Sequence, residues 1–454
     1  MQTPLCSGPL RRREFLRVGT LALGGLTLPQ LIRSQAQAAS PSPETSVILF
    51  WMWGGPSQLE TYDMKPDAPL EYRGPLRPIR TNVPGIEICE YMPGQAKIAD
   101  KFSIIRSLHH EMSAHNDGSI EMLTGKTPSI PDPTSQARSE HPDFGMIASR
   151  IRGARGDGLP QYIGAQRSPF MTNPGYLGVS HKAFETGDPS KPDFAPQNLT
   201  LSTGLDNGRL SDRKDLLAQF DHFRRGLDRD ADALDDFSRR AFTILTSPKV
   251  ARAFDLSQED VKLRDAYGRH RWGQSCLLAR RLAEAGAAVI NIDATAPNDT
   301  TKHFSWDDHA GAFHLDFAQR ERLPQMDQGL TALITDLHSR GLDNRVLVIA
   351  CGEFGRTPRV TYAPKNFSDQ PGVGRDHWPG AFSALIAGGG LKMGQIVGAT
   401  NSKSEYPVLD PVTPQDLLAT VYRHLGIDYR REFLNFAGRP VPILSQGKPI
   451  AALA

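Results

Sequence analysis

Short apolar runs that alternate with helical segments constrain the fold of this chain more than any other feature. The apolar runs are residues 47–53, 102–108, 288–292, 345–350 and 382–387. Segments with helical character lie between or after them, at residues 145–152, 267–286, 330–337 and 415–425. Such alternation predicts an α/β fold with a mostly parallel central sheet and helices on both faces.

Two further stretches have weaker patterns. Residues 153–212 are rich in Gly, Pro, Asp and Ser, so we expect loops there. Residues 213–245 carry charges at helical spacing and predict a solvated helix or helix pair.

Composition excludes some classes of protein. The 454 residues, 39% of them hydrophobic, suffice for one large domain, which we expect over residues 39–454. The 52 Lys and Arg nearly balance the 50 Asp and Glu, for a net charge of +2, which argues against a general nucleic-acid binder. No apolar run beyond the N-terminal region reaches the roughly 18–20 residues that span a bilayer, so a multi-pass membrane protein is not expected.

The N-terminal residues 1–38 have the pattern of an export signal. Residues 12–17 (Arg-Arg-Glu-Phe-Leu-Arg) resemble the twin-arginine consensus, an apolar stretch follows at 18–28, and Ala36-Gln37-Ala38 fits a cleavage site. A basic tail without an export role is the alternative. We expect export through the twin-arginine pathway to the periplasm or the exterior, with contact to the membrane only if the signal stays uncleaved.

The four cysteines do not form a recognisable framework. Cys6 lies in the predicted signal, and Cys89, Cys276 and Cys351 are far apart with no CxxC spacing. A disulfide scaffold and a cysteine-based zinc site are therefore not expected.

Polar side chains follow several predicted strands, where sites of open α/β sheets collect. They include His115, Asp307, His309, Glu353 and His377, with Arg356 and Arg375 near them. Imidazole and carboxylate groups together suit a divalent ion such as Zn, Mn, Fe or Ca. Asp307 and His309 face the same side only if their segment is extended. For any single histidine, a buried, hydrogen-bonded side chain or a surface residue is the alternative interpretation.

Other common site motifs are absent from the sequence. The three glycines at 388–390 lack P-loop spacing and fit a turn after a strand. No GxSxG motif supports a hydrolase serine.

Several segments resemble the DUF1501 family of exported proteins, grouped with the alkaline phosphatase/sulfatase-like superfamily. The matching segments are distributed over most of the chain after the signal: residues 53–57, 113–128, 267–286, 306–309, 352–358 and 374–379. The resemblance implies an alkaline phosphatase-like core and a divalent metal as cofactor.

The superfamily pattern is only partly present. Leu123-Thr124-Gly125 ends a segment like the superfamily's nucleophile segment, but His115 stands where Cys, Ser or Thr is usual. Gly54 and Gly55 stand where a metal-binding Asp is usual, and Glu353-Phe354-Gly355 replaces Asp-His-Gly. By contrast, His377 resembles the late metal histidine, and Asp307 with His309 resembles the Asp/His pair.

Two hypotheses follow from this mixture. In the first, the chain is a metal-dependent hydrolase of phosphate or sulfate esters, with Asp307, His309, Glu353 and His377 around a metal. His115 is then a catalytic nucleophile or a further ligand, and Arg356 or Arg375 holds the anion. Its substrate is a sulfated or phosphorylated small molecule or polysaccharide. In the second, the fold has lost catalysis and acts as a binding or scaffolding protein of the cell envelope.

Overall fold

The computed structural model describes residues 45–194, 247–298, 305–312 and 314–454. The predicted signal at residues 1–38 and the helix expected at 213–245 lie outside these residues. No helix within the described ranges has the length and apolarity that crossing a bilayer requires.

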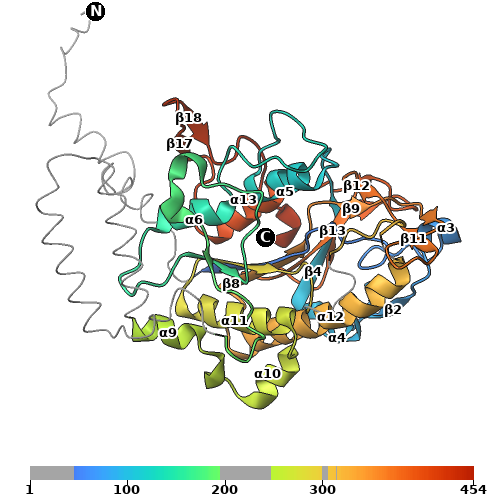
Figure 1. Ribbon diagram of the computed structural model, residues 1–454, viewed down its shortest axis with the longest axis horizontal. Helices are drawn as coiled ribbons and strands as arrows, with labels where there is room; N and C mark the ends of the chain where they lie inside the picture. The colour runs from blue at the N-terminus through green and yellow to red at the C-terminus, as the bar shows by residue number, and fades with distance from the viewer. Residues whose placement is uncertain (1–44, 195–246, 299–304, 313) are drawn as a thin grey trace, which may run out of the picture.

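An 8-stranded sheet forms the centre of the molecule (Figure 1), with the order β14-β4-β13-β8-β1-β7-β5-β6. Its strands are β1 (Ser46–Trp51), β4 (Phe102–Leu108), β5 (Tyr162–Ala165), β6 (Phe184–Glu185), β7 (Val289–Asp293), β8 (Val346–Cys351), β13 (Phe382–Gly388) and β14 (Ile396–Val397). All neighbouring strands run parallel except that β13 is antiparallel to both β4 and β8. The predicted mostly parallel sheet is confirmed.

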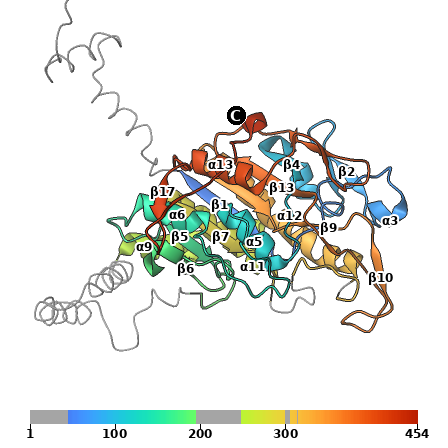
Figure 2. The ribbon, with the colours of Figure 1, turned by 90° about the horizontal axis from the view of Figure 1, so that it is seen from above.

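The central strands are apolar along their whole length because both faces of the sheet are covered. Every residue of β1 and of β8 is buried. In Figures 1 and 2, one face is covered by α4 (Pro93–Ala96), α9 (Pro248–Phe254), α10 (Val261–Tyr267), α11 (Arg271–Ala285) and α12 (Leu315–Ser339). The other face carries α5 (His115–Thr124), α6 (Phe144–Arg152) and α13 (Pro414–His424). A separate hydrophobic core fills each interface.

Local sequence signals explain where several helices begin and end. Thr413 and Asp416 form a capping box at the start of α13, with Pro414 in the first turn. Asp143 accepts a hydrogen bond from the Met146 N–H and so caps α6. Gly286 ends α11 in the left-handed conformation, as its position in the sequence predicts.

The region expected to be loops, residues 153–212, differs in part. It contains β5 and β6, which extend the sheet beyond β7. These strands have only four and two residues, too few for a periodic pattern to show in the sequence.

Smaller elements decorate the sheet. One short helix, α3 (Leu70–Arg73), precedes a ribbon of β2 (Pro78–Arg80) and β3 (Glu87–Cys89). Four more ribbons pair β9 (Gly355–Arg356) with β12 (His377–Trp378), β10 (Thr361–Ala363) with β11 (Gly372–Gly374), β15 (Ala399–Thr400) with β16 (Pro407–Leu409), and β17 (Glu432–Leu434) with β18 (Pro440–Pro442). The β9–β12 ribbon sets His377 opposite Arg356 and so brings two predicted site residues together.

Candidate metal centre

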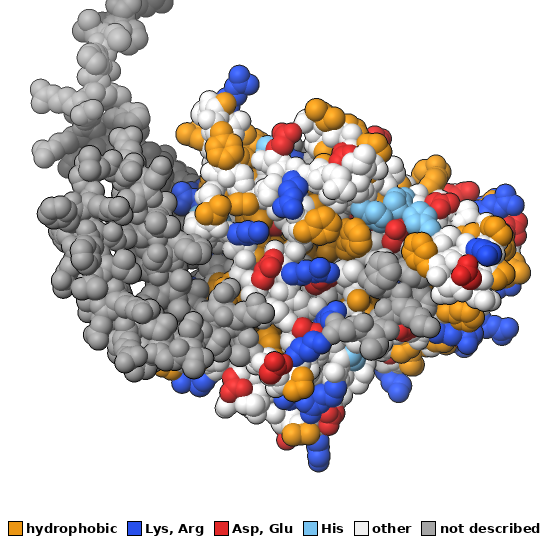
Figure 3. Space-filling view, viewed as in Figure 1, with side chains coloured by type: hydrophobic (Ala, Val, Ile, Leu, Met, Phe, Trp, Pro, Cys, Tyr) orange, Lys and Arg blue, Asp and Glu red, His pale blue; other side chains and the backbone are white. Residues whose placement is uncertain are grey.

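Three side chains from distant parts of the chain meet at the carboxyl edge of the sheet. His115, Asp307 and His377 each offer one ligand atom, and these atoms all lie within 4.8 Å of one another. His115 begins α5, Asp307 lies in the segment before α12, and His377 lies on β12. Histidine side chains gather at one place on the molecular surface in Figure 3. We call these three residues the His–Asp–His cluster.

His309 joins the cluster from the same segment as Asp307. Its Nε2 lies 3.0 Å from Asp307 Oδ1 and 3.0 Å from His377 Nε2. The sequence predicted that the two residues face the same side only in an extended segment, but the backbone here forms two successive three-residue turns, with the Asp308 N–H donating to the Trp306 carbonyl (3.0 Å) and the His309 N–H to the Asp307 carbonyl (2.9 Å). The structure places both side chains on one side of that segment.

The three imidazoles share one pattern of hydrogen bonds. The Nδ1 atoms of His115, His309 and His377 lie 2.7 Å from Glu353 Oε1, 2.8 Å from Asp376 Oδ1 and 2.6 Å from the carbonyl oxygen of Ser113. Carboxylates and carbonyls accept hydrogen bonds, so Nδ1 is the donor in each ring. With Nδ1 as the donor, the Nε2 of each ring faces Asp307 and would become available to a metal ion once it has lost its proton, the arrangement that orients histidine ligands in metal sites.

The distances from Asp307 to His115 and to His377 lie in the range of two ligands of one divalent ion. Ligand atoms about 2.0–2.2 Å from one ion, with bond angles between roughly 90° and 109°, lie roughly 3.0–3.5 Å apart. His115 Nε2 lies 3.3 Å from Asp307 Oδ2, and His377 Nε2 lies 3.2 Å from Asp307 Oδ1. The two Nε2 atoms of His309 and His377, at 3.0 Å, need either a proton or a cation between them, because two lone pairs repel each other. The donor set therefore suits Zn, Mn or Fe.

The pKa values of the clustered side chains are shifted in different directions: they are raised for His115 and His309 and lowered for Asp307 and His377. Burial alone would lower the pKa of His115, but its hydrogen bonds to Asp307 and Glu353 outweigh burial and raise the pKa to about 9. The hydrogen bond to Asp307 also raises the pKa of His309, against the effect of burial. Burial raises the pKa of Asp307, but the three imidazoles and Arg356 hold it well below its usual range. Burial lowers the pKa of His377 more than Asp307 raises it.

Glu353 lies behind His115, outside the His–Asp–His cluster. The side chain is fully buried, and its Oε1 accepts hydrogen bonds from His115 Nδ1 and from the Gly54 N–H at 2.8 Å. Its Oε2 has no hydrogen-bond partner among the residues that the structure describes. The Glu353 carboxylate is therefore positioned to orient the His115 ring.

The two predicted anion-binding arginines are both fully buried. Arg356 contacts the carbonyl oxygens of Gly54 and Gly55, and its Nη2 lies 2.6 Å from Asp307 Oδ1. Arg375 forms an ion pair with Glu60 at 2.7 Å. Each guanidinium thus has internal acceptors, and a role in holding an anion stays a prediction.

Both nitrogens of His115 are engaged, one by Glu353 and one by Asp307. This suits a ligand better than a nucleophile, and its predicted catalytic role stays open. Sequence reasoning missed Asp376 and the Ser113 carbonyl as partners of the rings. Asp376 directly precedes His377 in the chain, but no spacing rule connects it to His309.

The glycine pair after β1 makes room for the cluster. Gly54 has a φ of +112°, and a Cβ built there would lie 2.6 Å from the Asp307 backbone N. The Trp306 N–H also donates a hydrogen bond of 3.2 Å to the Trp53 carbonyl. The segment carrying Asp307 therefore packs on the strand end only because residue 54 lacks a side chain.

Three solved structures with an overall similarity to this chain are those of enzymes. They are the lipoteichoic acid synthase LtaP from Listeria monocytogenes (9% identity, TM-score 0.38, covering 91% of this chain and 80% of that chain), a sulfatase from Pseudoalteromonas sp. (13%, 0.35, 92% and 72%) and a phosphonate monoester hydrolase from Silicibacter pomeroyi (12%, 0.36, 85% and 74%). Similarities of this size say nothing about the chemistry of the site.

Among curated proteins, no relative matches this chain. A family model described as "Protein of unknown function (DUF1501)" matches residues 44–454. That range includes the His–Asp–His cluster and every strand of the central sheet. The chain belongs to the DUF1501 family.

Proposed function

We propose that this protein is a metal-dependent hydrolase of phosphate or sulfate esters. One observation carries the proposal: three imidazole Nε2 atoms converge on the Asp307 carboxylate, and each ring is fixed through Nδ1. Such preorganised donors at the carboxyl edge of a mostly parallel sheet are the usual setting of a catalytic metal. The proposed substrates are sulfated or phosphorylated small molecules or polysaccharides.

In this proposal, His115, Asp307 and His377 hold the divalent ion, and His309 is a fourth, more exposed donor. The ion would supply a Lewis acid for an ester oxygen. Glu353 keeps the His115 ring in the tautomer that offers Nε2, and the Ser113 carbonyl does the same for His377. Arg356 offsets the negative charge of Asp307 and fixes its orientation.

A second candidate function is a non-catalytic binding protein of the cell envelope. One observation favours it: Asp307 is already paired with Arg356 and hydrogen-bonded to the imidazoles. Such internal pairing satisfies the cluster without an ion, as expected of a site that has lost catalysis.

Export through the twin-arginine pathway, with residues 1–38 as the signal, belongs to the same proposal. Replacing both arginines of the signal, Arg12→Lys together with Arg13→Lys, should keep the protein inside the cell. Cell fractionation followed by mass spectrometry of the N-terminus measures both the location and the cleavage site. A location unchanged by this double substitution contradicts the proposed route.

The experiment that separates the two functions is elemental analysis of protein purified without chelator. We expect about one equivalent of Zn, Mn or Fe, lost in His377→Ala and retained in the control His338→Ala. His338 lies on α12, forms an ion pair with Asp343, and is partly exposed like His377. The loaded protein should hydrolyse members of a panel of aryl phosphates and aryl sulfates.

Protein that contains no metal and takes up none when Zn, Mn, Fe or Ca is added would overturn the hydrolase proposal. The same result would favour the envelope-binding function. Metal retained in His377→Ala would show that the ion binds elsewhere.

A further inference from the structure

A cavity of about 600 Å³ opens beside the His–Asp–His cluster, at the carboxyl ends of β1, β5 and β7. Trp53 connects the two features. Its side chain lines the cavity, and its ring centroid lies 5.0 Å from that of His115. A molecule in the cavity would therefore sit next to the proposed metal ligands.

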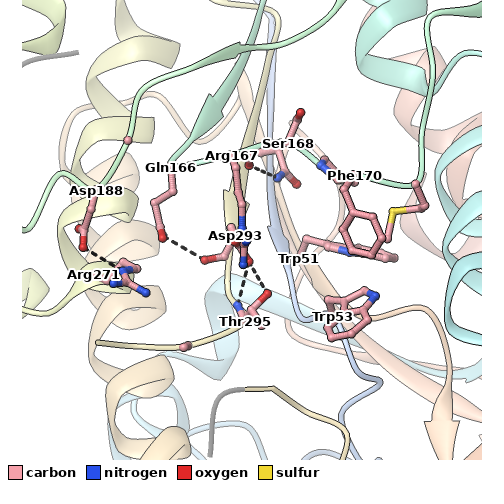
Figure 4. A pocket seen from close by; sticks show the side chains of 15 residues that line it. Trp51, Trp53, Gln166, Arg167, Ser168, Phe170, Asp188, Arg271, Asp293 and Thr295 are labelled. Carbon is pink, nitrogen blue, oxygen red and sulfur yellow. Dashed lines mark hydrogen bonds and ion pairs between the residues drawn. The ribbon is translucent and has the colours of Figure 1, made fainter. Parts of the chain in front are cut away.

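The cavity has an aromatic side and a polar side (Figure 4). Trp51, Trp53 and Phe170 form the aromatic side, and the rings of Trp53 and Phe170 meet edge to face at 5.9 Å. Phe170 keeps 50% of its surface exposed, so its ring is accessible to a ligand in the cavity.

The polar side contains two ion pairs. Arg167 contacts Asp293, and Arg271 Nε lies 2.9 Å from Asp188 Oδ2. Figure 4 shows Arg167 reaching down toward Asp293, opposite the aromatic side chains. Because each cation has an acidic partner, the charges of this wall cancel. The wall offers donors and acceptors to a neutral ligand rather than a net charge to an ionic one.

Three polar atoms of the residues that line the cavity lack partners within the described part of the chain. They are the donors Trp51 Nε1 and Trp53 Nε1 and the acceptor Asn291 Oδ1. Trp51 and Asn291 are almost completely buried, at 3% and 2% exposure, so each missing hydrogen bond carries a desolvation cost. Hydroxyl groups both donate and accept, so a hydroxylated ligand matches walls that offer both donors and acceptors.

We propose that this cavity binds the ring of a neutral sugar, with the apolar face of the ring on Phe170 and Trp53 and its hydroxyl groups on the polar side. The inference rests on the proposed function, in that the sugar would be the alcohol part of the ester. A purely aromatic ligand would leave the polar side without partners. An anionic ligand would meet a wall without net charge.

Binding of uncharged oligosaccharides tests the proposal without requiring a metal. The full-length protein is treated with chelator and titrated with cellohexaose, mannohexaose and agarohexaose. Tryptophan fluorescence and saturation-transfer NMR follow binding. We expect at least one of the three to bind, and Phe170→Ala to weaken that binding about tenfold through loss of the stacking surface.

Phe436→Ala is the matched control, because Phe436 is an exposed phenylalanine outside the cavity. It should bind the oligosaccharide like the parent protein. Trp51→Phe keeps an aromatic ring but removes the pyrrole part of the indole with its unpaired N–H, so a smaller loss of affinity, about threefold, is expected there.

Two results would overturn the sugar proposal. One is that none of the three oligosaccharides binds at 10 mM; the other is that Phe170→Ala and Phe436→Ala bind alike. Neither result bears on metal content, so the proposed hydrolase would stand if the protein still bound one equivalent of metal. Sugar binding by a protein that holds no metal would keep the sugar site and remove its link to ester hydrolysis.

Discussion

Asp307 and Asp308 are neighbours in the chain, yet their carboxylates lie in opposite surroundings. Asp307 faces the imidazoles at the edge of the sheet and keeps part of its surface exposed. Asp308 is fully buried against the fully buried Arg322, 2.6 Å away, and accepts a further hydrogen bond from Gln319. Arg322 in turn packs on the Trp306 ring, 4.7 Å from its centroid. One carboxylate thus belongs to the candidate metal centre, and the other anchors the segment that carries both residues.

Adjacent acidic residues such as Asp307 and Asp308 can therefore have different roles. Successive side chains of this segment point in opposite directions, so residues 307 and 309 face the cluster while residue 308 faces the core. The sequence alone shows the alternation, but it does not show which side holds the arginine.

Replacing each carboxylate by its amide is the strongest test of this division. Asp308→Asn leaves Arg322 buried without a counter-charge, and we expect it to lower the free energy of unfolding by about 3 kcal/mol. Asp307→Asn should cost less stability but abolish metal retention, because the amide is a poor ligand. Urea denaturation and elemental analysis of both variants measure the two effects. Equal losses of stability would erase the distinction.

His110 and His115 both contact Glu353, but their pKa values are shifted in opposite directions. Burial lowers the pKa of His110 to about 4, and its ring lies 2.6 Å from the Glu353 carbonyl oxygen. In the unfolded chain the pKa is about 6.5, so the unfolded state binds more protons between these values. The contribution of His110 to the free energy of unfolding should therefore fall by about 3 kcal/mol as the pH drops from about 6.5 to about 4.

The control for this pH effect is His110→Asn, which keeps a polar side chain but does not titrate. Urea denaturation at several pH values should give the variant a flatter profile than the parent protein over the same window. Parallel profiles would mean that His110 does not stay neutral in the folded state.

Gly54→Ala tests whether the close backbone packing beside Asp307 is needed for the metal centre. The added Cβ would press on the Asp307 N, and the positive φ adds strain, for a loss of about 1–3 kcal/mol. Gly341→Ala is the matched control, since Gly341 also has a positive φ but no atom lies within 4 Å of its Cβ position. We expect metal loss in Gly54→Ala only. Thermal denaturation measures the stability of both variants, and elemental analysis measures their metal content. Equal stability and equal metal content would show that the contact between the added Cβ and Asp307 has no effect.

Glu353→Gln should have the smallest effect. The amide keeps the size of the side chain but weakens the hold on His115 Nδ1, so we expect metal affinity to fall by about 10–100-fold with little change in stability. Competition with a chelating dye measures the affinity. Loss of all metal, as in Asp307→Asn, would instead make Glu353 a direct ligand.

Much of the fold follows from the sequence because its strands are apolar on both faces. Residues 102–108 coincide with β4, and the expected strands at 345–350 and 382–387 correspond to β8 and β13 within one residue. The direction of β13 did not follow, because pairing depends on distant partners rather than on the pattern of the strand itself. Nor did the helix that begins at His115, since the hydrophobic residues of α5 lack a clear periodicity and the helix is buried on all sides.

The sequence predicted which residue types form the site, but not which side chains pair with one another. Asp307, His309 and His377 were expected near one another, and the structure brings them together. The burial of Arg356 and Arg375 was not foreseeable, because an arginine that binds a ligand and one that pairs with a buried carboxylate look alike in a sequence. Their partners, Asp307 and Glu60, lie 49 and 315 positions away.

The positions of the cluster residues in the sequence bear on whether folding or metal binding would come first. Its donors come from residues 115, 307 and 377, so a bound ion would cross-link segments that are far apart before folding. An unfolded chain would have to close two very long loops to offer the same atoms, at a high cost in entropy. Under the proposed function, metal uptake would therefore follow folding rather than guide it.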